Sequence, residues 1–168
     1  MKKIEVNSLI YNGIVKLLGS AGFKGKKSES KFKRKTTYEF QEIGHPVWDY
    51  NPTFAFSFFV TIRIDEIEDI LGEVFSRSAK DCSKTPTVTL QEKFFIGKNL
   101  RFEVQSEKEI ETALNELNKT FETSVIPALD SYTDLALLER LLNSQLETSH
   151  SINLEVVANA GVLAAALC

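Results

Sequence analysis

Hydrophobic residues in the N-terminal segment recur every three or four positions, which places them on one stripe of a helix. This spacing predicts a helix over about residues 3–20. Gly19 and Gly22 lie where the helix should end, because glycine readily takes the positive φ angle that closes a last helical turn. The predicted stripe consists of Val6, Ile10, Ile14, Leu17 and Leu18.

After this helix the hydrophobic period changes to two, the period of a β-strand. The pattern predicts a short strand over residues 23–27 and, after a turn, a second strand over residues 31–41. Phe32, Tyr38 and Phe40 are expected on one face of the second strand, with its charged residues on the other.

The clearest strand pattern runs from Phe54 to Ile64, where every second residue is hydrophobic. We expect one central antiparallel strand there. A helix over about residues 65–75 follows directly, with Asp65 as its N-cap and Glu68 three residues further on, as in a capping box.

The next segment is predicted to form a hairpin followed by a helix. A strand over residues 87–96 is expected to join, through a glycine-containing turn, a second strand over residues 100–104 whose hydrophobic residues alternate cleanly with polar ones. Ser106 and Glu109 form a capping box ahead of an amphipathic helix. Pro127 should end or kink this helix, because its ring removes a backbone donor.

The order of elements is therefore a helix, a run of strands, an inserted helix, a hairpin and C-terminal helices. The last two of these helices are expected to begin near residues 133 and 151. This order predicts the α+β class, with an antiparallel sheet of four to five strands and the helices packed on one face. The 168 residues are expected to form one domain, with the packing of residues 148–168 left open.

The composition is that of an ordinary folded protein, because 43% of the residues are hydrophobic and 26% are charged. Polar residues interrupt any N-terminal export signal, and the uncharged stretch Val156–Cys168 is shorter than the roughly 18 residues that a membrane span needs. Cys82 and Cys168, the only cysteines, show no disulfide pattern. We therefore expect a cytoplasmic protein without a membrane partner.

Charge is distributed unevenly along the chain. Residues 1–37 hold ten Lys or Arg residues against two acidic residues, a net charge of +8, whereas residues 38–168 hold ten against 21, a net charge of −11. Most of the positive charge lies in the segment from Lys24 to Lys35. Such a run commonly marks an interaction surface.

On a hairpin, lysines spaced two apart would face one way and could bind nucleic acid or another anionic ligand, with Phe32 and Tyr38 available for stacking. The favoured interpretation is that these lysines keep an edge strand soluble, since the whole chain is acidic. The candidate lysines are Lys24, Lys26, Lys31, Lys33 and Lys35.

Residues 45–52, His-Pro-Val-Trp-Asp-Tyr-Asn-Pro, form the most distinctive loop. Trp48 and Tyr50 resemble the aromatic anchors that dominate interface energetics, and His45 with Asp49 would order the loop. The alternative is a long connection whose Trp48 folds back on the sheet edge. A catalytic His45–Asp49 pair is disfavoured, because no nucleophile accompanies it.

An acidic cluster is expected on the exposed faces of the helix over residues 65–75. A solvated face is favoured over a metal site, because hard cations need oxygens from more than one element. Glu66, Asp69 and Glu73 are the candidates for contact with a protein partner. The full cluster is Asp65, Glu66, Glu68, Asp69 and Glu73.

No catalytic or cofactor motif in the chain is complete. Residues 19–27 depart from a phosphate-binding loop, because Ser20 stands where glycine is required and a helix precedes the segment. Neither cysteine has a second thiol or a histidine at metal-ligand spacing. We therefore predict a protein that is not an enzyme and that has no cofactor and no metal ion.

Three features together resemble an uncharacterised family of bacterial cytoplasmic domains, known only as a domain of unknown function. They are the stretch from Leu18 to Lys27, the strand from Phe54 to Ile64, and Ile126-Pro127-Ala128-Leu129 before a helix. Some relatives in that family lie near polymorphic-toxin loci as candidate immunity proteins. The resemblance spans about residues 3–145 and implies an α+β fold without catalytic residues.

The leading hypothesis is a non-enzymatic bacterial module that binds another protein through the Trp48 loop or the acidic helical face. An immunity-type inhibitor is its more specific form. The second hypothesis is nucleic-acid or anionic-ligand binding by the basic hairpin. The identity of the partner and the oligomeric state stay open.

Overall fold

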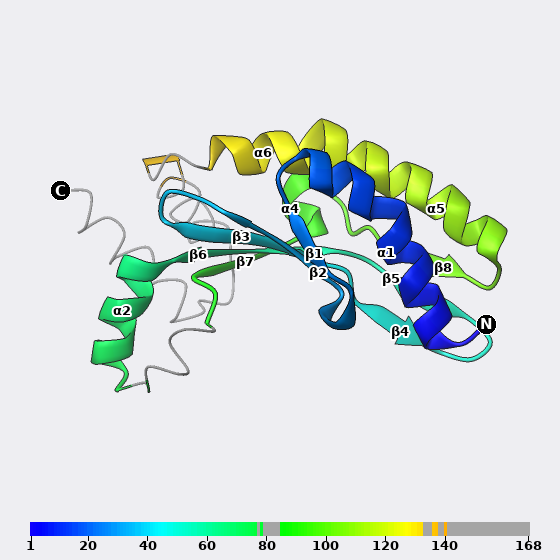
Figure 1. The fold of residues 1–168 in the computed structure, drawn as a ribbon, viewed down its shortest axis with the longest axis horizontal. Coiled ribbons are helices and arrows are strands. Elements are labelled where there is room, and N and C mark those ends of the chain that lie inside the picture. Colours follow the sequence, from blue (N-terminus) through cyan, green and yellow to red (C-terminus); the bar gives the residue numbers. More distant parts are fainter. Residues whose placement is uncertain (77, 79–84, 133–135, 138–139, 141–168) are drawn as a thin grey trace.

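Two antiparallel sheets lie under a layer of helices in the computed structural model, which describes residues 1–76, 78, 85–132, 136–137 and 140 (Figure 1). The predicted α+β class is confirmed. The larger sheet has the strand order β1-β2-β3-β6-β7 and the smaller sheet the order β4-β5-β8. The predicted helices beyond residue 132 lie largely outside the described residues, as do Cys82, His150 and Cys168.

The strands of the larger sheet are β1 Lys24–Lys26, β2 Lys31–Lys35, β3 Glu39–Gly44, β6 Phe59–Ile64 and β7 Val88–Gln91. The strands of the smaller sheet are β4 Val47–Asp49, β5 Phe54–Phe56 and β8 Phe102–Val104. The helices are α1 Lys3–Ser20, α2 Asp65–Val74, α4 Glu92–Ile96, α5 Glu107–Thr120 and α6 Ile126–Ser131, with the short 3₁₀ turn η1 Lys27–Glu29 and the π-helical turn η2 Phe121–Val125.

The predicted N-terminal helix is confirmed as α1 over residues 3–20. Gly22 takes a φ angle of +84°, and the backbone N–H of Phe23 donates to the carbonyl oxygen of Leu18 at 2.9 Å. This turn reverses the chain into β1. The hydrophobic stripe faces the sheet, with Val6, Ile10, Ile14 and Leu18 fully buried.

The single strand predicted over residues 31–41 is wrong, because β2 and β3 are two arms of an antiparallel hairpin. Lys35 pairs with Phe40 across the turn, so the alternation of faces restarts in β3. Phe32 faces the helices and is fully buried, whereas Phe40 lies on the opposite face with the lysines. A period of two cannot be carried through a turn.

The long strand predicted from Phe54 to Ile64 is also divided. β5 belongs to the smaller sheet and β6 to the larger one, with Ser57 and Phe58 between them. The Ser57 hydroxyl donates to the carbonyl oxygen of Leu100 at 2.6 Å. All six alternating hydrophobic residues are buried as expected, because both sheets face one core. They are Phe54, Phe56, Phe58, Val60, Ile62 and Ile64.

The inserted helix α2 forms at the predicted place with different end contacts. Ile64 is its N-cap residue, and Asp65 accepts from the guanidinium of Arg63 at 2.7 Å instead of capping the helix. Glu68 is buried, so the acidic cluster is not wholly exposed. Ile70 and Val74 are exposed although their spacing fits the buried stripe.

The hairpin predicted over residues 87–104 is wrong. The first arm becomes β7 followed by the short helix α4, and Gly97 closes that helix with a φ angle of +71°. The second arm becomes β8, which pairs with β5 of the smaller sheet. Both arms have the right local pattern, but neither partner was predicted.

The C-terminal helical arm begins at the predicted cap. The Ser106 hydroxyl accepts from the backbone N–H of Glu109 at 3.3 Å, and the helix α5 follows. Pro127 does not end the helical path. The turn widens to a π-helix at η2 immediately before the proline and continues as α6.

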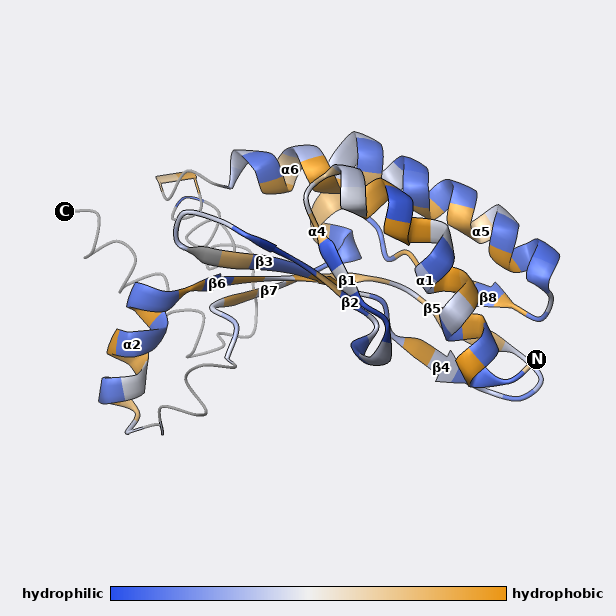
Figure 2. Ribbon diagram, viewed as in Figure 1, coloured by the Kyte–Doolittle hydropathy of each residue, from blue (hydrophilic) through white to orange (hydrophobic). Residues whose placement is uncertain are grey.

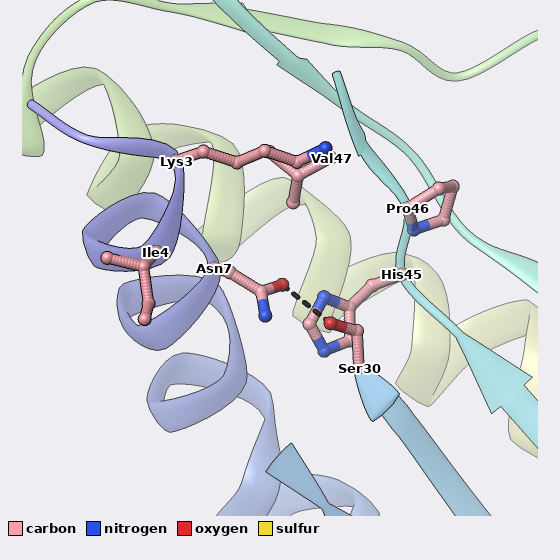
Figure 3. A pocket seen from close by; sticks show the side chains of 7 residues that line it. All are labelled: Lys3, Ile4, Asn7, Ser30, His45, Pro46 and Val47. Carbon is pink, nitrogen blue, oxygen red and sulfur yellow. Dashed lines mark hydrogen bonds between the residues drawn. The ribbon is translucent and has the colours of Figure 1, made fainter. Parts of the chain in front are cut away.

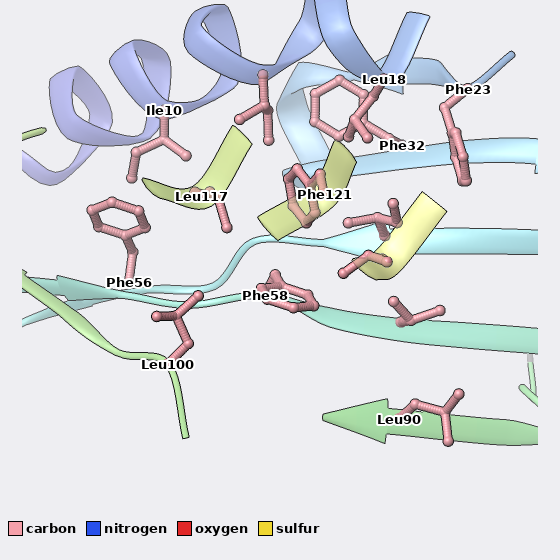
Figure 4. Close-up of a cluster of buried hydrophobic side chains, with 14 of the residues drawn as sticks. Ile10, Leu18, Phe23, Phe32, Phe56, Phe58, Leu90, Leu100, Leu117 and Phe121 are labelled. Atoms are coloured by element: carbon pink, nitrogen blue, oxygen red, sulfur yellow. The ribbon is translucent and has the colours of Figure 1, made fainter. Parts of the chain in front are cut away.

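The hydrophobic core lies between the helix layer and both sheets. Phe58 contacts Phe121 edge-to-face at a centroid distance of 5.1 Å, which joins the chain between the sheets to the π-helical turn (Figure 4). In Figure 2 the strands β6 and β7 are largely hydrophobic, whereas β2 is hydrophilic along much of its length. Within the described residues, no helix is long and apolar enough to cross a membrane.

Candidate functional site

Trp48 and Tyr50 are exposed on the outer face of the smaller sheet. The register pairs Trp48 with Ala55, and Ala55 with Glu103. The inner face of this sheet is covered by α1 and α5, so Val47 is buried whereas Trp48 is 40% and Tyr50 55% exposed. Strand alternation therefore turns Trp48 toward solvent, and Tyr50 is exposed directly after the end of β4.

The guanidinium of Arg101 lies within cation–π distance of both rings. Its carbon atom Cζ is 5.7 Å from the ring centre of Trp48 and 5.1 Å from that of Tyr50. Arg101 also pairs with the carboxylate of Glu103, at 3.7 Å. We call Trp48, Tyr50 and Arg101 the aromatic–arginine cluster.

No sequence pattern identified Arg101 as a candidate site residue. It precedes β8, which lies about fifty residues away from Trp48 along the chain, and only the pairing of β8 with β5 brings the two together. An exposed arginine that alternates with hydrophobic residues is ordinary for a strand, so the residue type did not distinguish Arg101. Sequence reasoning therefore found the two aromatic residues and missed the cation beside them.

Local hydrogen bonds hold the loop that carries Tyr50. The carboxylate of Asp49 accepts from the backbone N–H of Asn51 at 3.1 Å. The N–H of Tyr50 donates to the carbonyl oxygen of Thr53 at 2.9 Å, and the Thr53 hydroxyl accepts from the Gln105 amide at 2.9 Å. Asp49 thus binds the backbone of the loop, whereas the sequence predicted that it orders the loop together with His45.

His45 lies apart from these exposed residues. Its side chain is fully buried, and neither ring nitrogen has a hydrogen-bond partner among the described residues, so the predicted contact with Asp49 is absent. The ring lies 6.0 Å from Phe32 and 6.4 Å from Tyr11, measured between centroids. Burial disfavours the charged imidazolium and lowers the pKa of His45 to about 4.

A pocket of about 520 Å³ opens beside His45, at the N-terminal end of α1 (Figure 3). At its wall the Ser30 hydroxyl donates to the side-chain oxygen of Asn7 at 2.8 Å. The ring nitrogens of His45 are buried below this surface. The lining residues are Lys3, Ile4, Asn7, Ser30, His45, Pro46 and Val47.

The acidic candidates lie at the opposite end of the molecule. Glu66, Asp69 and Glu73 are exposed on α2, which Figure 1 shows far from β4. The exposed side chains of Ile70 and Val74 lie on the same helix. The two predicted protein-binding surfaces are therefore separate, and one partner contacting both would have to span the molecule.

The five candidate lysines lie on one face of β1 and β2, as their spacing predicted. Lys24 is directly opposite Lys33, and Lys26 is directly opposite Lys31, while Lys35 continues the row along β2. This face points away from α1, α5 and α6 (Figure 1). We call the face formed by these five residues the lysine face.

The aromatic residues proposed for base stacking are not available there. Phe32 is fully buried and stacks on Tyr11 at a centroid distance of 4.9 Å. The hydroxyl of Tyr38 donates to the carbonyl oxygen of Tyr132 at 2.6 Å, and burial raises its pKa. Both residues serve the packing of the helices on the sheet.

Within the described part of the chain, no three His, Cys, Asp or Glu side chains lie close enough to hold a metal ion. Comparisons with protein-family models, with curated proteins and with solved structures each found no match. The resemblance to an uncharacterised bacterial family stays a prediction, and the geometry of the chain carries the functional argument.

Proposed function

We propose that this protein is a non-enzymatic module that binds another protein through the aromatic–arginine cluster. The observation that carries the proposal is that Arg101 lies within cation–π distance of two exposed aromatic rings beside the smaller sheet. Tryptophan, tyrosine and arginine are the residues most enriched among interface hot spots. Here all three lie side by side.

The cluster suits binding because much of its order exists before a partner arrives. The Tyr50 loop is held by backbone hydrogen bonds, and Arg101 is held by two rings and by Glu103. Side chains that are already ordered lose less conformational entropy on association. We expect the partner to offer an apolar patch to the rings and a carboxylate to Arg101.

The resemblance described above makes the hypothesis more specific. An immunity-type protein of the bacterial cytoplasm binds one toxin and blocks it, so the expected partner is a single protein bound in fixed stoichiometry. Such a role requires no catalytic residue.

Affinity capture with tagged protein tests this proposal, using native lysate treated with nuclease. The double variant Trp48→Ala, Tyr50→Ala should lose a stoichiometric partner that the unchanged protein retains. The matched control is Ile70→Ala, Val74→Ala, which removes the exposed hydrophobic residues of α2 and should keep the partner. Circular dichroism must show that both variants fold.

Retention of the partner by the first variant would remove the cluster from the proposal. Loss in the α2 control, or in a variant with Glu66, Asp69 and Glu73 changed to Lys, would move the interface to the acidic helix. Both aromatic side chains are substantially exposed, so their removal should leave the fold intact.

A further inference from the structure

The charges of the lysine face are only partly neutralised by the protein itself. Lys26 pairs with Glu29, and Lys31 pairs with Glu42 at 2.8 Å. The ammonium of Lys33 lies 3.3 Å from the ring centre of Phe40. Lys33 lies directly opposite Glu42 in the β2–β3 ladder, so Lys31 and Lys33 share one carboxylate. Among the described residues, Lys24 and Lys35 form no ion pair with a carboxylate.

The arrangement of these lysines costs stability in the free protein. Lys24 and Lys33 are directly opposite each other in the β1–β2 ladder, as are Lys26 and Lys31. Like charges at directly opposed positions of an antiparallel pair repel each other and destabilise the pair. An anion that bridges both strands would remove this repulsion.

Spacing favours a polyanion over isolated anions. Side chains two residues apart on a strand are about 7 Å apart, and neighbouring strands are about 4.8 Å apart. The lysines therefore form two parallel rows of cations that one continuous chain of phosphates can follow. Separate lipid headgroups are not linked to one another, so each would have to bind its lysine independently.

The chemistry of the surrounding surface favours phosphate contacts without base contacts. Arg34, the residue best suited to bidentate recognition, points to the helix side and pairs with Asp130 at 2.7 Å. Phe40 is only 8% exposed and Phe59 is half-buried, so neither offers a ring for stacking. What remains is a cationic face that cannot read sequence.

Exposed glutamates disfavour phosphate binding on the helix layer. The exposed glutamates of α5 and η2 lie in the helix layer, on the side of the larger sheet opposite the lysine face (Figure 1). They repel phosphate from the helix layer, whereas the lysine face attracts it. These residues are Glu107, Glu109, Glu111, Glu116 and Glu122.

From these observations we infer that the lysine face binds the phosphodiester backbone of nucleic acid without sequence preference. This site is separate from the aromatic–arginine cluster, and its failure would leave the proposed protein interaction untouched. Duplex DNA is the matching probe, because it presents phosphates without requiring base stacking.

The test is fluorescence anisotropy of the full chain with a labelled duplex of about 25 base pairs, from about 50 to about 200 mM salt. The logarithm of the association constant should fall with the logarithm of salt concentration with a slope of about −3 to −4.5, for three to five phosphate contacts. A second duplex of unrelated sequence should bind equally well.

The variant Lys24→Ala, Lys33→Ala removes one opposed pair and should lower the magnitude of the slope by about 2. Lys98→Ala, Lys108→Ala is the matched control, since both lysines are exposed outside the lysine face, and it should keep the slope. The melting temperature of the free protein should also rise with salt, and rise less in the Lys24, Lys33 variant.

Three outcomes would overturn the inference. They are absence of binding at low salt, equal loss of binding in both variants, and binding to phosphatidylserine vesicles without binding to the duplex. Both altered lysines are exposed, so the variant should fold, and circular dichroism checks this. Lys35→Ala provides an independent removal of one contact.

Discussion

The buried amide of Gln41 in β3 donates from Nε2 to the carbonyl oxygen of Leu129 in α6, at 2.8 Å. The same nitrogen donates to the hydroxyl of Tyr38 at 3.0 Å, and the amide oxygen accepts from Nε of Arg34 at 2.8 Å. Gln41 is fully buried, and each of its polar atoms has a partner. The Gln41 side chain therefore links α6 to the larger sheet by a hydrogen bond.

Gln41→Leu should lower the free energy of unfolding by about 2 to 4 kcal/mol, because it leaves the Leu129 carbonyl and the Arg34 Nε without these partners in a buried site. Urea denaturation measures this change. Gln91→Leu, at an exposed position of β7, should change stability by less than about 0.5 kcal/mol. Equal effects of the two substitutions would show that the buried network contributes little.

His45 should make stability depend on pH. Its pKa is about 4 in the folded protein and about 6.5 in the unfolded chain, so between these values only the unfolded chain binds the proton. The free energy of unfolding is therefore highest above about pH 6.5 and falls by about 3 kcal/mol as the pH is lowered to about 4.

His45→Phe should remove this dependence, since phenylalanine fills similar space between Tyr11 and Phe32 and does not titrate. Urea denaturation between about pH 4 and about pH 7 measures both proteins. The variant should be at least as stable as the unchanged protein at pH 7, because two unpartnered buried nitrogens are removed. An unchanged pH profile in the variant would assign the dependence to other groups.

Gly25 allows β1 to lie close to α1 and thereby positions the lysine face. A Cβ atom added at Gly25 would clash with the hydroxyl of Tyr11 and would lie 2.8 Å from the ring of Phe32. Gly25→Ala should therefore cost about 1 to 3 kcal/mol. Gly19→Ala, in the last turn of α1 with open space around it, should stabilise by up to about 1 kcal/mol. Thermal denaturation measures both variants, and the melting temperature should fall for Gly25→Ala and rise for Gly19→Ala. An unchanged melting temperature in Gly25→Ala would contradict the close approach of β1 to α1.

Phe121 fills the core where α5 passes into the π-helical turn, edge-to-face with Phe58. Phe121→Ala should destabilise the protein by about 3 to 5 kcal/mol, because it leaves a large cavity under the helix layer. Phe102→Ala, at a half-buried position of β8, should cost less. Calorimetric melting compares the two, and a similar loss for both would mean that the core closes around the cavity.

Local patterns predicted single elements well and pairings poorly. The helix at residues 3–20 and the cap at Ser106 were predicted from neighbours within one or two turns, and both formed. The segment 92–96 was predicted as the end of a strand but forms α4, in which Phe95 packs against Phe58. That contact joins residues far apart in sequence, so no window along the chain contains it.

The candidate sites divide in the same way. Trp48, Tyr50 and the row of lysines were visible as residue types at regular spacing, and strand alternation placed them at the surface. His45 looked equally available, but it is buried because the chain between β3 and β4 passes under the start of α1. Burial depends on what packs over a residue, which spacing alone does not state.

The amino-acid sequence by itself determined the α+β class, the helical stripe of α1, the burial of every second residue from Phe54 to Ile64 as a hydrophobic side chain, and the separation of charge. Each follows from periodicity or composition, which short-range backbone geometry turns into structure. The tertiary structure decided the division into two sheets and the meeting of Arg101 with Trp48 and Tyr50. These depend on which distant strands pair, and that choice rests on the packing free energy of the whole chain.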